Sequence, residues 1–385
     1  MAKRIMIAGC VAGAGPGYGG NTWAFLQYVL GLRRLGFDAY YIEQIAPEKC
    51  VDEDGQRVCF AHSVNATHFR TLIDRFDLAD QAALFDRDDS GSVGLSLAQL
   101  ERLAPDIDLL INLSGNLRRE SILTKVRKRM YLDMDPGYTQ IWQELGFDIY
   151  LRGHDVYVTT GLNLGKTDCP FPTCGIRWES TLPPVVLCEW VTDQVPGLAY
   201  STIADWRGFK PVQWRGVWYG QKADEFLRLI DLPQRVSVPL EICLLINSNE
   251  KARFELEQHD WRLVSPSDHA STPDDYRRYI FGSRGEFTVV KGGYTAGRTG
   301  WFSDRSACYL AAGRPVIVQD TGIGKYLPTG SGFLTFTDID TAAEAINNVE
   351  SDYARHAAAA VSFAREFLDS DLVLSRLMRL AGYEP

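Results

Sequence analysis

The stretch from Ser283 to Gly322 gathers the side chains best suited to bind an anionic ligand. A predicted strand ends at Lys291, and Ser303 is placed to cap a helix predicted over 303–312. Open α/β sheets bind ligands at the carboxyl ends of their parallel strands, so these groups are expected to share one site. The candidate ligand-binding residues here are Lys291, Arg298, Thr299, Gly300, Trp301, Ser303, Asp304, Arg305 and Asp320.

A glycine-rich loop at 13–20 is the second candidate site. Its Gly15-x-Gly17-x-x-Gly20 spacing matches the dinucleotide fingerprint, and Glu43 ends the next predicted strand, where an acid can bind a ribose hydroxyl. Glycines also let backbone N–H groups approach any phosphate at a helix N-terminus. Three interpretations stay open: NAD binding, a plain strand–helix connection, and a loop facing a sugar or phosphate in a cleft between domains. We favour the third, with Gly17, Gly19, Gly20 and Asn21 as candidates.

The elements that position these residues alternate between strand and helix. Strands are predicted at 4–11, 38–43, 108–115, 129–135 and 155–161, with a helix that Asn21 would cap between the first two. A segment rich in Pro, Gly and Cys at 163–186 is predicted to be a linker. Further strands follow at 199–206, 240–246, 261–264, 286–291, 314–318 and 332–336, with helices between them and a helical stretch at 351–383. The expected fold is therefore α/β, with two Rossmann-like, doubly wound domains facing a cleft.

The second half of the chain resembles a known family. Its pattern of helix, Ala311-x-Gly313-x-Pro315-Val316, strand and then Asp320-x-Gly322 is similar to the C-terminal domain of GT-B glycosyltransferases, and 270–370 resembles an uncharacterised bacterial group of them. The resemblance implies an acceptor-side domain at 1–190, a nucleotide-sugar-binding domain at 191–368, and a helix at 369–385 that crosses back to the first domain. It implies transfer of a hexosyl or deoxysugar group to an acceptor hydroxyl, without a cofactor.

Glycosyl transfer requires groups that stabilise a departing diphosphate and, where the enzyme inverts, a general base. Lys222 begins the helix after the second domain's first strand, where related enzymes hold a diphosphate-binding lysine. Asp135 and His154 lie near predicted strand ends of the first domain and are the candidate bases, although Asp135 could merely cap a helix and a lone histidine is more often structural. Many retaining members carry two glutamates eight residues apart. Gly300 and Cys308 stand at those places here, so the anomeric outcome stays open.

The composition limits the classes of partner that the protein is expected to bind. The 385 residues carry 40 Lys and Arg against 49 Asp and Glu, a net charge of −9, which argues against nucleic-acid binding. No apolar run has the length of a membrane span, and no secretion signal is evident. The cysteines are scattered along the sequence, and we expect them to be reduced thiols of a cytoplasmic protein. No metal site is expected. The alternatives that remain are an NAD-linked oxidoreductase and a non-catalytic nucleotide- or sugar-binding protein on the same fold. Oligomeric state is not indicated.

Overall fold

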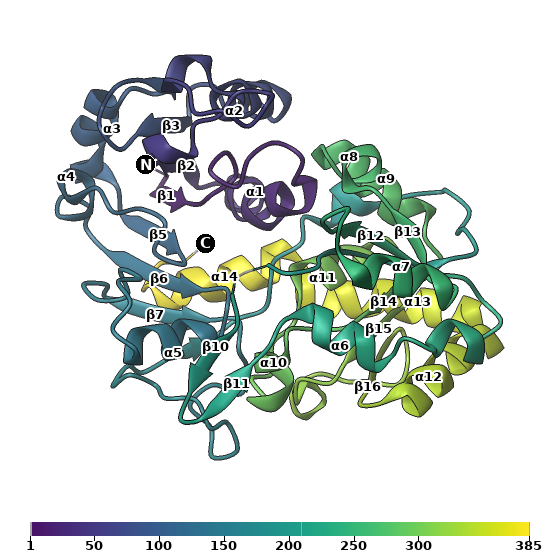
Figure 1. Cartoon of the computed structure of the whole chain (residues 1–385). Helices are drawn as coiled ribbons and strands as arrows, with labels where there is room; N and C mark the ends of the chain where they lie inside the picture. Colours follow the sequence, from purple (N-terminus) through teal and green to yellow (C-terminus); the bar gives the residue numbers. More distant parts are fainter. Residues whose placement is uncertain (1, 209, 385) are drawn as a thin grey trace.

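The computed structural model describes residues 2–208 and 210–384. They form two α/β halves, each built on a largely parallel sheet (Figure 1). The first sheet has the strand order β4-β3-β2-β1-β5-β6-β7-β8, in which β4 alone runs antiparallel to its neighbour. The second has the order β13-β12-β9-β14-β15-β16 and is parallel throughout. The predicted two-domain, doubly wound α/β fold is confirmed.

The first half begins with short apolar strands, as buried parallel strands require. Its core beside α1 contains Ile5, Ile7 and Val29, while Met6 and Ala8 on the other face of β1 pack towards α3. The strands are β1 (Arg4–Ala8), β2 (Asp38–Ile45), β3 (Ala82–Asp86), β4 (Ser92–Gly94), β5 (Leu109–Leu113), β6 (Arg129–Asp133), β7 (Val156–Thr159) and β8 (Glu179–Ser180). The helices are α1 (Gly19–Arg34), η1 (Pro47–Lys49), η2 (Phe60–His62), α2 (Val64–Arg75), α3 (Leu97–Leu103), η3 (Ala104–Asp106), α4 (Glu120–Leu123) and α5 (Tyr138–Glu144).

The second half covers its sheet with helices on both faces. One core lies among α6, α7 and α12, and the other lies among α9, α11 and α13. Its strands are β9 (Tyr200–Asp205), β12 (Leu240–Leu245), β13 (Arg262–Val264), β14 (Gly285–Thr288), β15 (Val316–Gln319) and β16 (Phe333–Phe336). Its helices are η4 (Leu187–Trp190), α6 (Lys222–Arg228), η5 (Leu232–Arg235), α7 (Lys251–Gln258), α8 (Pro266–His269), α9 (Pro273–Gly282), α10 (Gly292–Ala296), α11 (Asp304–Ala311), η6 (Ile323–Lys325), α12 (Ile339–Ser351), α13 (Tyr353–Phe363) and η7 (Ala364–Leu368), a π-helical turn.

The C-terminal helix α14 (Ser370–Leu380) leaves the second half and lies against α1 (Figure 1). Leu374, Leu377 and Met378 of α14 are buried in the same core as Val29 and Leu32 of α1. The chain therefore passes between the two halves twice, once before β9 and once at η7. No helix among the described residues is long and apolar enough to span a bilayer.

Two local expectations are wrong. Asn21 does not cap α1, because the helix begins at Gly19 behind Tyr18 and the Asn21 amide donates to the carbonyl of Cys10 instead. The segment 163–186 is not a free linker, because β8 pairs with β7 and Phe171 is buried. A hairpin of β10 (Val212–Trp214) and β11 (Val217–Tyr219), absent from the expected elements, reaches across to α5, where the indole N–H of Trp214 donates to Glu144 at 2.5 Å.

Candidate active site

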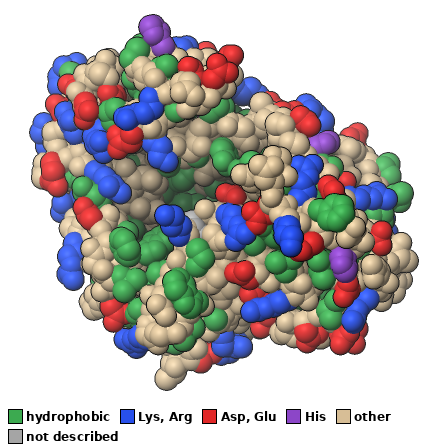
Figure 2. Space-filling view, in the orientation of Figure 1, with side chains coloured by type: hydrophobic (Ala, Val, Ile, Leu, Met, Phe, Trp, Pro, Cys, Tyr) green, Lys and Arg blue, Asp and Glu red, His purple; other side chains and the backbone are tan. Residues whose placement is uncertain are grey.

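A cavity of about 520 Å³ lies between the two halves, at the carboxyl ends of β6, β9, β12 and β14. Figure 2 shows the molecule hollowed between its halves, with charged side chains at the mouth of the hollow. The wall from the first half is formed by Pro16, Gly17, Tyr18, Gly19, Gly20, Asn21, Ala24, Met134 and Asp135. The wall from the second half is formed by Ile203, Ala204, Asp205, Lys222, Leu245, Pro266, Ser267, Ala270, Tyr276, Lys291, Tyr294, Trp301, Ser303, Asp304 and Arg305.

Lys222 is the first residue of α6 and lines this cavity from the second half. Its half-buried ammonium makes no hydrogen bond or ion pair with any residue that the structure describes. Burial lowers the pKa of Lys222 well below its usual value, and the positive charges of Arg305 and Lys291 lower it further. The carboxylates of Glu286 and Asp304 offset this lowering only in part. A cavity cation with no direct partner among the described residues is available to an anionic ligand.

Asp135 faces the same cavity from the loop after β6. The ammonium of Lys291 lies 2.9 Å from its Oδ1, and the hydroxyl of Tyr294 donates to that same oxygen at 2.6 Å. Burial raises the pKa of Asp135, but Lys291 and Tyr294 outweigh it, so the net pKa is lowered. Both donors belong to the second half, so Asp135 joins the two walls of the cavity.

Asp133 fixes the loop that carries Asp135. Its carboxylate accepts hydrogen bonds from Thr139 at 2.6 Å, Gln140 at 3.0 Å and Thr159 at 2.8 Å, and from the backbone N–H of Asp135 at 3.0 Å. Burial raises the pKa of Asp133 to about 6 in spite of these donors. Asp133 therefore positions Asp135 rather than facing a ligand itself.

Arg305 lines the cavity, and its guanidinium already has protein partners. It ion-pairs with the buried Glu286 and donates to the Ile203 carbonyl and the Thr288 hydroxyl, both at 2.9 Å. Burial alone would lower the pKa of Arg305, but the Glu286 carboxylate raises it overall. Arg305 thus contributes positive potential to the site while its hydrogen bonds join β9, β14 and α11.

Helix α11 begins at the cavity with Ser303 as its cap, because the Ser303 hydroxyl accepts from the Arg305 N–H at 3.2 Å. The carboxyl of Asp304 lines the cavity one residue later, and its burial raises its pKa. Trp301 stacks on Tyr294 with ring centroids 4.3 Å apart. The helix terminus therefore offers backbone donors beside a carboxyl group and an aromatic wall.

Four predicted donor-site residues lie outside the cavity lining. Thr299 and Gly300 form a joint between the halves, where their carbonyls accept from Asn163 and Leu162, and Arg298 lies 3.8 Å from Asp168. Asp320 caps its own turn by accepting from the Gly322 N–H at 2.8 Å. These residues were expected at the ligand site because they lie on either side of α11 in the sequence. The loop before Trp301 instead turns towards the first half.

His154, predicted as a base, also lies outside the cavity lining. Its ring contacts Tyr131 edge-on at 5.3 Å, and its nitrogens meet the Asn112 amide at 3.3 Å and the Leu151 carbonyl at 3.2 Å. Burial lowers the pKa of His154. The contacts are those of a histidine packed inside the first half.

Glu43 does not point towards a ligand. Its buried carboxylate accepts hydrogen bonds from the backbone N–H groups of Val11 at 2.7 Å and Ala12 at 2.9 Å, and from that of Gly13. Burial raises its pKa to about 7, although these donors oppose the rise. An acid used to hold the glycine-rich loop is not available to a ribose hydroxyl.

Gly19 and Gly20 bring α1 directly against the second half. The N–H of Gly19 donates to the Ala270 carbonyl at 2.9 Å, and a Cβ on Gly19 would lie 2.2 Å from the Thr272 carbonyl oxygen. A Cβ on Gly20 would meet the Tyr276 ring at 2.5 Å. These glycines are needed for contact between the halves at the edge of the cavity.

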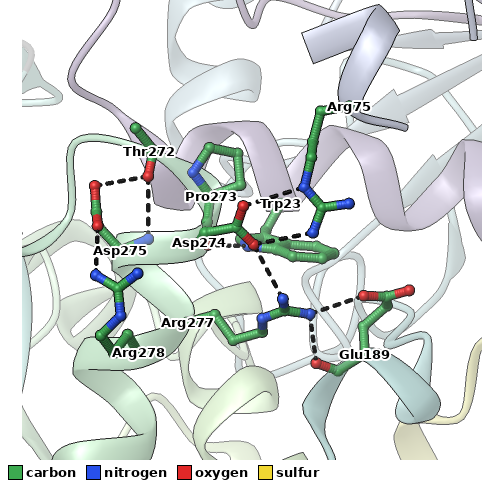
Figure 3. Close-up of polar contacts among 9 residues, drawn as sticks. All are labelled: Trp23, Arg75, Glu189, Thr272, Pro273, Asp274, Asp275, Arg277 and Arg278. Carbon is green, nitrogen blue, oxygen red and sulfur yellow. Dashed lines mark hydrogen bonds and ion pairs between the residues drawn. The ribbon is translucent and has the colours of Figure 1, made fainter. Parts of the chain in front are cut away.

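Charged pairs reinforce this contact (Figure 3). Arg75 of α2 holds Asp274 through two hydrogen bonds of 3.1 Å, and Arg277 bridges Asp274 and Glu189. The Trp23 indole N–H donates to the Pro273 carbonyl at 2.9 Å. Together with the Asp135–Lys291 pair, these contacts hold the two halves against each other on either side of the cavity.

Sequence reasoning missed several lining residues, among them Tyr18, Asp205, Tyr276 and Tyr294. Asp205 carried a usable signal, because it lies at the carboxyl end of the predicted strand 199–206, which is the ligand-binding edge. Tyr294 carried none, since its partner Asp135 is 159 residues away in the sequence.

Solved structures share this fold over nearly the whole chain. Anabaena HepE, solved in complex with UDP, superimposes with a TM-score of 0.58 at 12% identity, covering 99% of both chains, and it was also solved with UDP-glucose. AviGT4, a glycosyltransferase of avilamycin A biosynthesis, gives 0.55 at 10% identity over 99% of this chain and 97% of its own. Sucrose-phosphate synthase from Thermosynechococcus elongatus gives 0.56 at 10% identity over 98% of each. The chain has the GT-B fold.

Neither a protein-family model nor a curated protein sequence matches the chain. The GT-B fold explains why the cavity lies where it does, between the facing carboxyl edges of two Rossmann-like sheets. The described residues hold no group of three or more His, Cys, Asp or Glu side chains that could bind a metal ion.

Proposed function

We propose that the protein transfers a sugar from a nucleoside diphosphate sugar to an acceptor hydroxyl. The observation that carries the proposal is the cavity between the halves, with unpartnered Lys222 on one wall and Asp135 on the other. Support comes from the GT-B fold and from a neighbour of that fold that was solved with UDP and with UDP-glucose.

The second half supplies the groups for the donor. Lys222 and the backbone N–H groups at the start of α11 bind the diphosphate and stabilise the charge that develops on it. Asp304 would repel phosphate, so we assign it to a hydroxyl of the transferred sugar, where a carboxyl group accepts a hydrogen bond. No metal ion and no cofactor is part of the proposal, since the nucleotide sugar is a co-substrate.

The first half supplies the acceptor side. Asp135 takes the proton of the acceptor hydroxyl as the acceptor oxygen bonds to the anomeric carbon. The bond from that carbon to the phosphate oxygen breaks, and its electron pair leaves with the diphosphate. The products are a glycosylated acceptor, a nucleoside diphosphate and one proton on Asp135.

Two alternatives have less support. An NAD-linked oxidoreductase would need Glu43 for the ribose, and that carboxylate is occupied by backbone N–H groups. A non-catalytic binding protein would not need a carboxylate held across the cavity from the cationic wall. We place the reaction in the cytoplasm, where the eight unpaired cysteines would remain reduced.

A nucleotide panel tests the donor assignment. UDP, GDP, dTDP, ADP, CDP and NAD are screened for a rise in melting temperature, and one nucleoside diphosphate is expected to stabilise the wild type but not Lys222→Met. Stabilisation by NAD alone would refute the proposal.

The matching sugar nucleotide then tests the catalytic carboxylate. Asp135→Asn should lower its turnover, measured as released diphosphate, by roughly 10²–10⁴-fold. His154→Gln is the control and should keep its rate. Full activity in Asp135→Asn would refute the role of this carboxylate.

A further inference from the structure

The two donors on Asp135 share one of its oxygens. Lys291 and Tyr294 both contact Oδ1, at 2.9 and 2.6 Å, and no described residue donates a hydrogen bond to Oδ2. Because Asp135 lines the cavity, Oδ2 is the oxygen available to an incoming hydroxyl. Two hydrogen-bond donors on Oδ1 fix the direction in which Oδ2 points.

The two donors differ in mobility. Tyr294 is 1% exposed, stacks on Trp301 and meets Tyr138 edge-on at 5.5 Å, so its hydroxyl is held in place. Lys291 reaches Asp135 through a flexible four-carbon stem, and its side chain is 21% exposed. The lysine can change partner where the tyrosine cannot.

The cavity offers Lys291 a second partner once an anion enters. Lys291 and Lys222 line the same cavity, and the charge of Lys291 contributes to the lowered pKa of Lys222. A diphosphate bound at Lys222 therefore lies within the electrostatic reach of Lys291. Its multiple negative charges compete with the single charge of Asp135 for that ammonium.

We propose that Lys291 exchanges Asp135 for the diphosphate when the donor binds, while Tyr294 keeps hold of Oδ1 and leaves Asp135 free to act on the acceptor. The proposal rests on the proposed function and assigns Tyr294 as a positioning residue. In the absence of the nucleotide sugar, Lys291 forms an ion pair with Asp135 and keeps this carboxylate a weak base. When the nucleotide sugar is bound, the Lys291 ammonium stabilises the leaving diphosphate, and Asp135 becomes a stronger base. The nucleotide sugar must therefore bind, and draw Lys291 away from Asp135, before Asp135 can take the proton of the acceptor hydroxyl.

A double-mutant cycle with inorganic pyrophosphate tests the exchange without needing the nucleotide. Its affinity is measured by calorimetry for the full-length wild type, Asp135→Asn, Lys291→Met and the double variant, each checked for folding by circular dichroism. Asp135→Asn should bind pyrophosphate about tenfold more tightly, because Lys291 is no longer shared. In the Lys291→Met background the same change should have no effect.

The chain provides a matched control in Asp168, which pairs with Lys325 across the two halves but does not line the cavity. Asp168→Asn should leave pyrophosphate affinity unchanged. If Asp135→Asn does not fold, Asp135→Ser takes its place in the cycle. If Asp135→Asn does not change pyrophosphate affinity, the exchange is overturned. The exchange is also overturned if Asp135→Asn raises the affinity equally in the wild-type and Lys291→Met backgrounds, because an equal effect reflects only the removal of charge repulsion.

Tyr294→Phe tests the positioning role, because it removes the hydroxyl and keeps the stacked ring. Asp135 then depends more on Lys291, so pyrophosphate affinity should fall several-fold, and this fall should vanish in the Asp135→Asn background. A fall that persists there would reflect packing and would overturn the role of Tyr294. If the wild type fails to bind pyrophosphate, the phosphate site itself is overturned, and the proposed function fails with it.

Discussion

Replacing Lys222 by methionine should make the free protein more stable and its phosphate site weaker. The ammonium is half-buried, has no partner among the described residues, and shares the cavity with Lys291 and Arg305. Methionine keeps most of the apolar stem and removes a charge whose burial Glu286 and Asp304 offset only in part. A gain of about 1 kcal/mol in the free energy of unfolding is expected, because apolar replacement of a buried charge is often stabilising.

The binding loss follows from the contact that disappears. A hydrogen bond to a charged group contributes about 1.5–3 kcal/mol, so the dissociation constant for pyrophosphate should rise roughly 10- to 150-fold. Calorimetry measures the affinity, and urea unfolding measures the stability. Lys251→Met, an exposed lysine at the start of α7, is the control and should change neither quantity much.

The stability gain should depend on pH in a defined direction. Folding lowers the pKa of Lys222 from its ordinary 10.5, so between the two values the folded protein binds fewer protons than the unfolded chain. The wild type therefore gains stability from this residue as pH rises towards 10.5, and the advantage of Lys222→Met shrinks. A variant that is less stable at every pH and still binds pyrophosphate normally would refute the reasoning.

Three further predictions concern the supports of the site. Burial raises the pKa of Glu43 from 4.5 to about 7. Between these pH values, this group should therefore lower the free energy of unfolding by up to about 3 kcal/mol as the pH rises. Glu43→Gln should remove this pH dependence, as measured by urea titrations. Gly19→Ala should separate the halves and increase the radius of gyration in small-angle scattering, whereas Gly324→Ala, at an exposed glycine whose Cβ would approach no atom closer than 3.6 Å, should not; equal radii would contradict the contact. Arg305→Met should cost about 3–5 kcal/mol by stranding buried Glu286, and adding Glu286→Gln should recover much of it; no loss in the single variant would show that the pair is not needed.

The sequence by itself determined most strands, most helices and the edge of each sheet where a ligand is expected to bind. These features depend on short-range patterns: apolar runs such as 4–8 and 109–113 make buried parallel strands, and glycines end helices. The same patterns placed Lys222, Lys291 and Ser303 at element boundaries, and all three line the cavity.

Only the tertiary structure decided what those residues contact. Lys291 meets Asp135 across 156 positions, Arg305 is engaged by Glu286, and Gly19 packs against the chain at Thr272. Periodicity and capping rules describe neighbours within one element and carry no information on which loops meet when two sheets face each other. Thr299 shows the limit, because it flanks α11 in sequence yet turns to the joint between the halves.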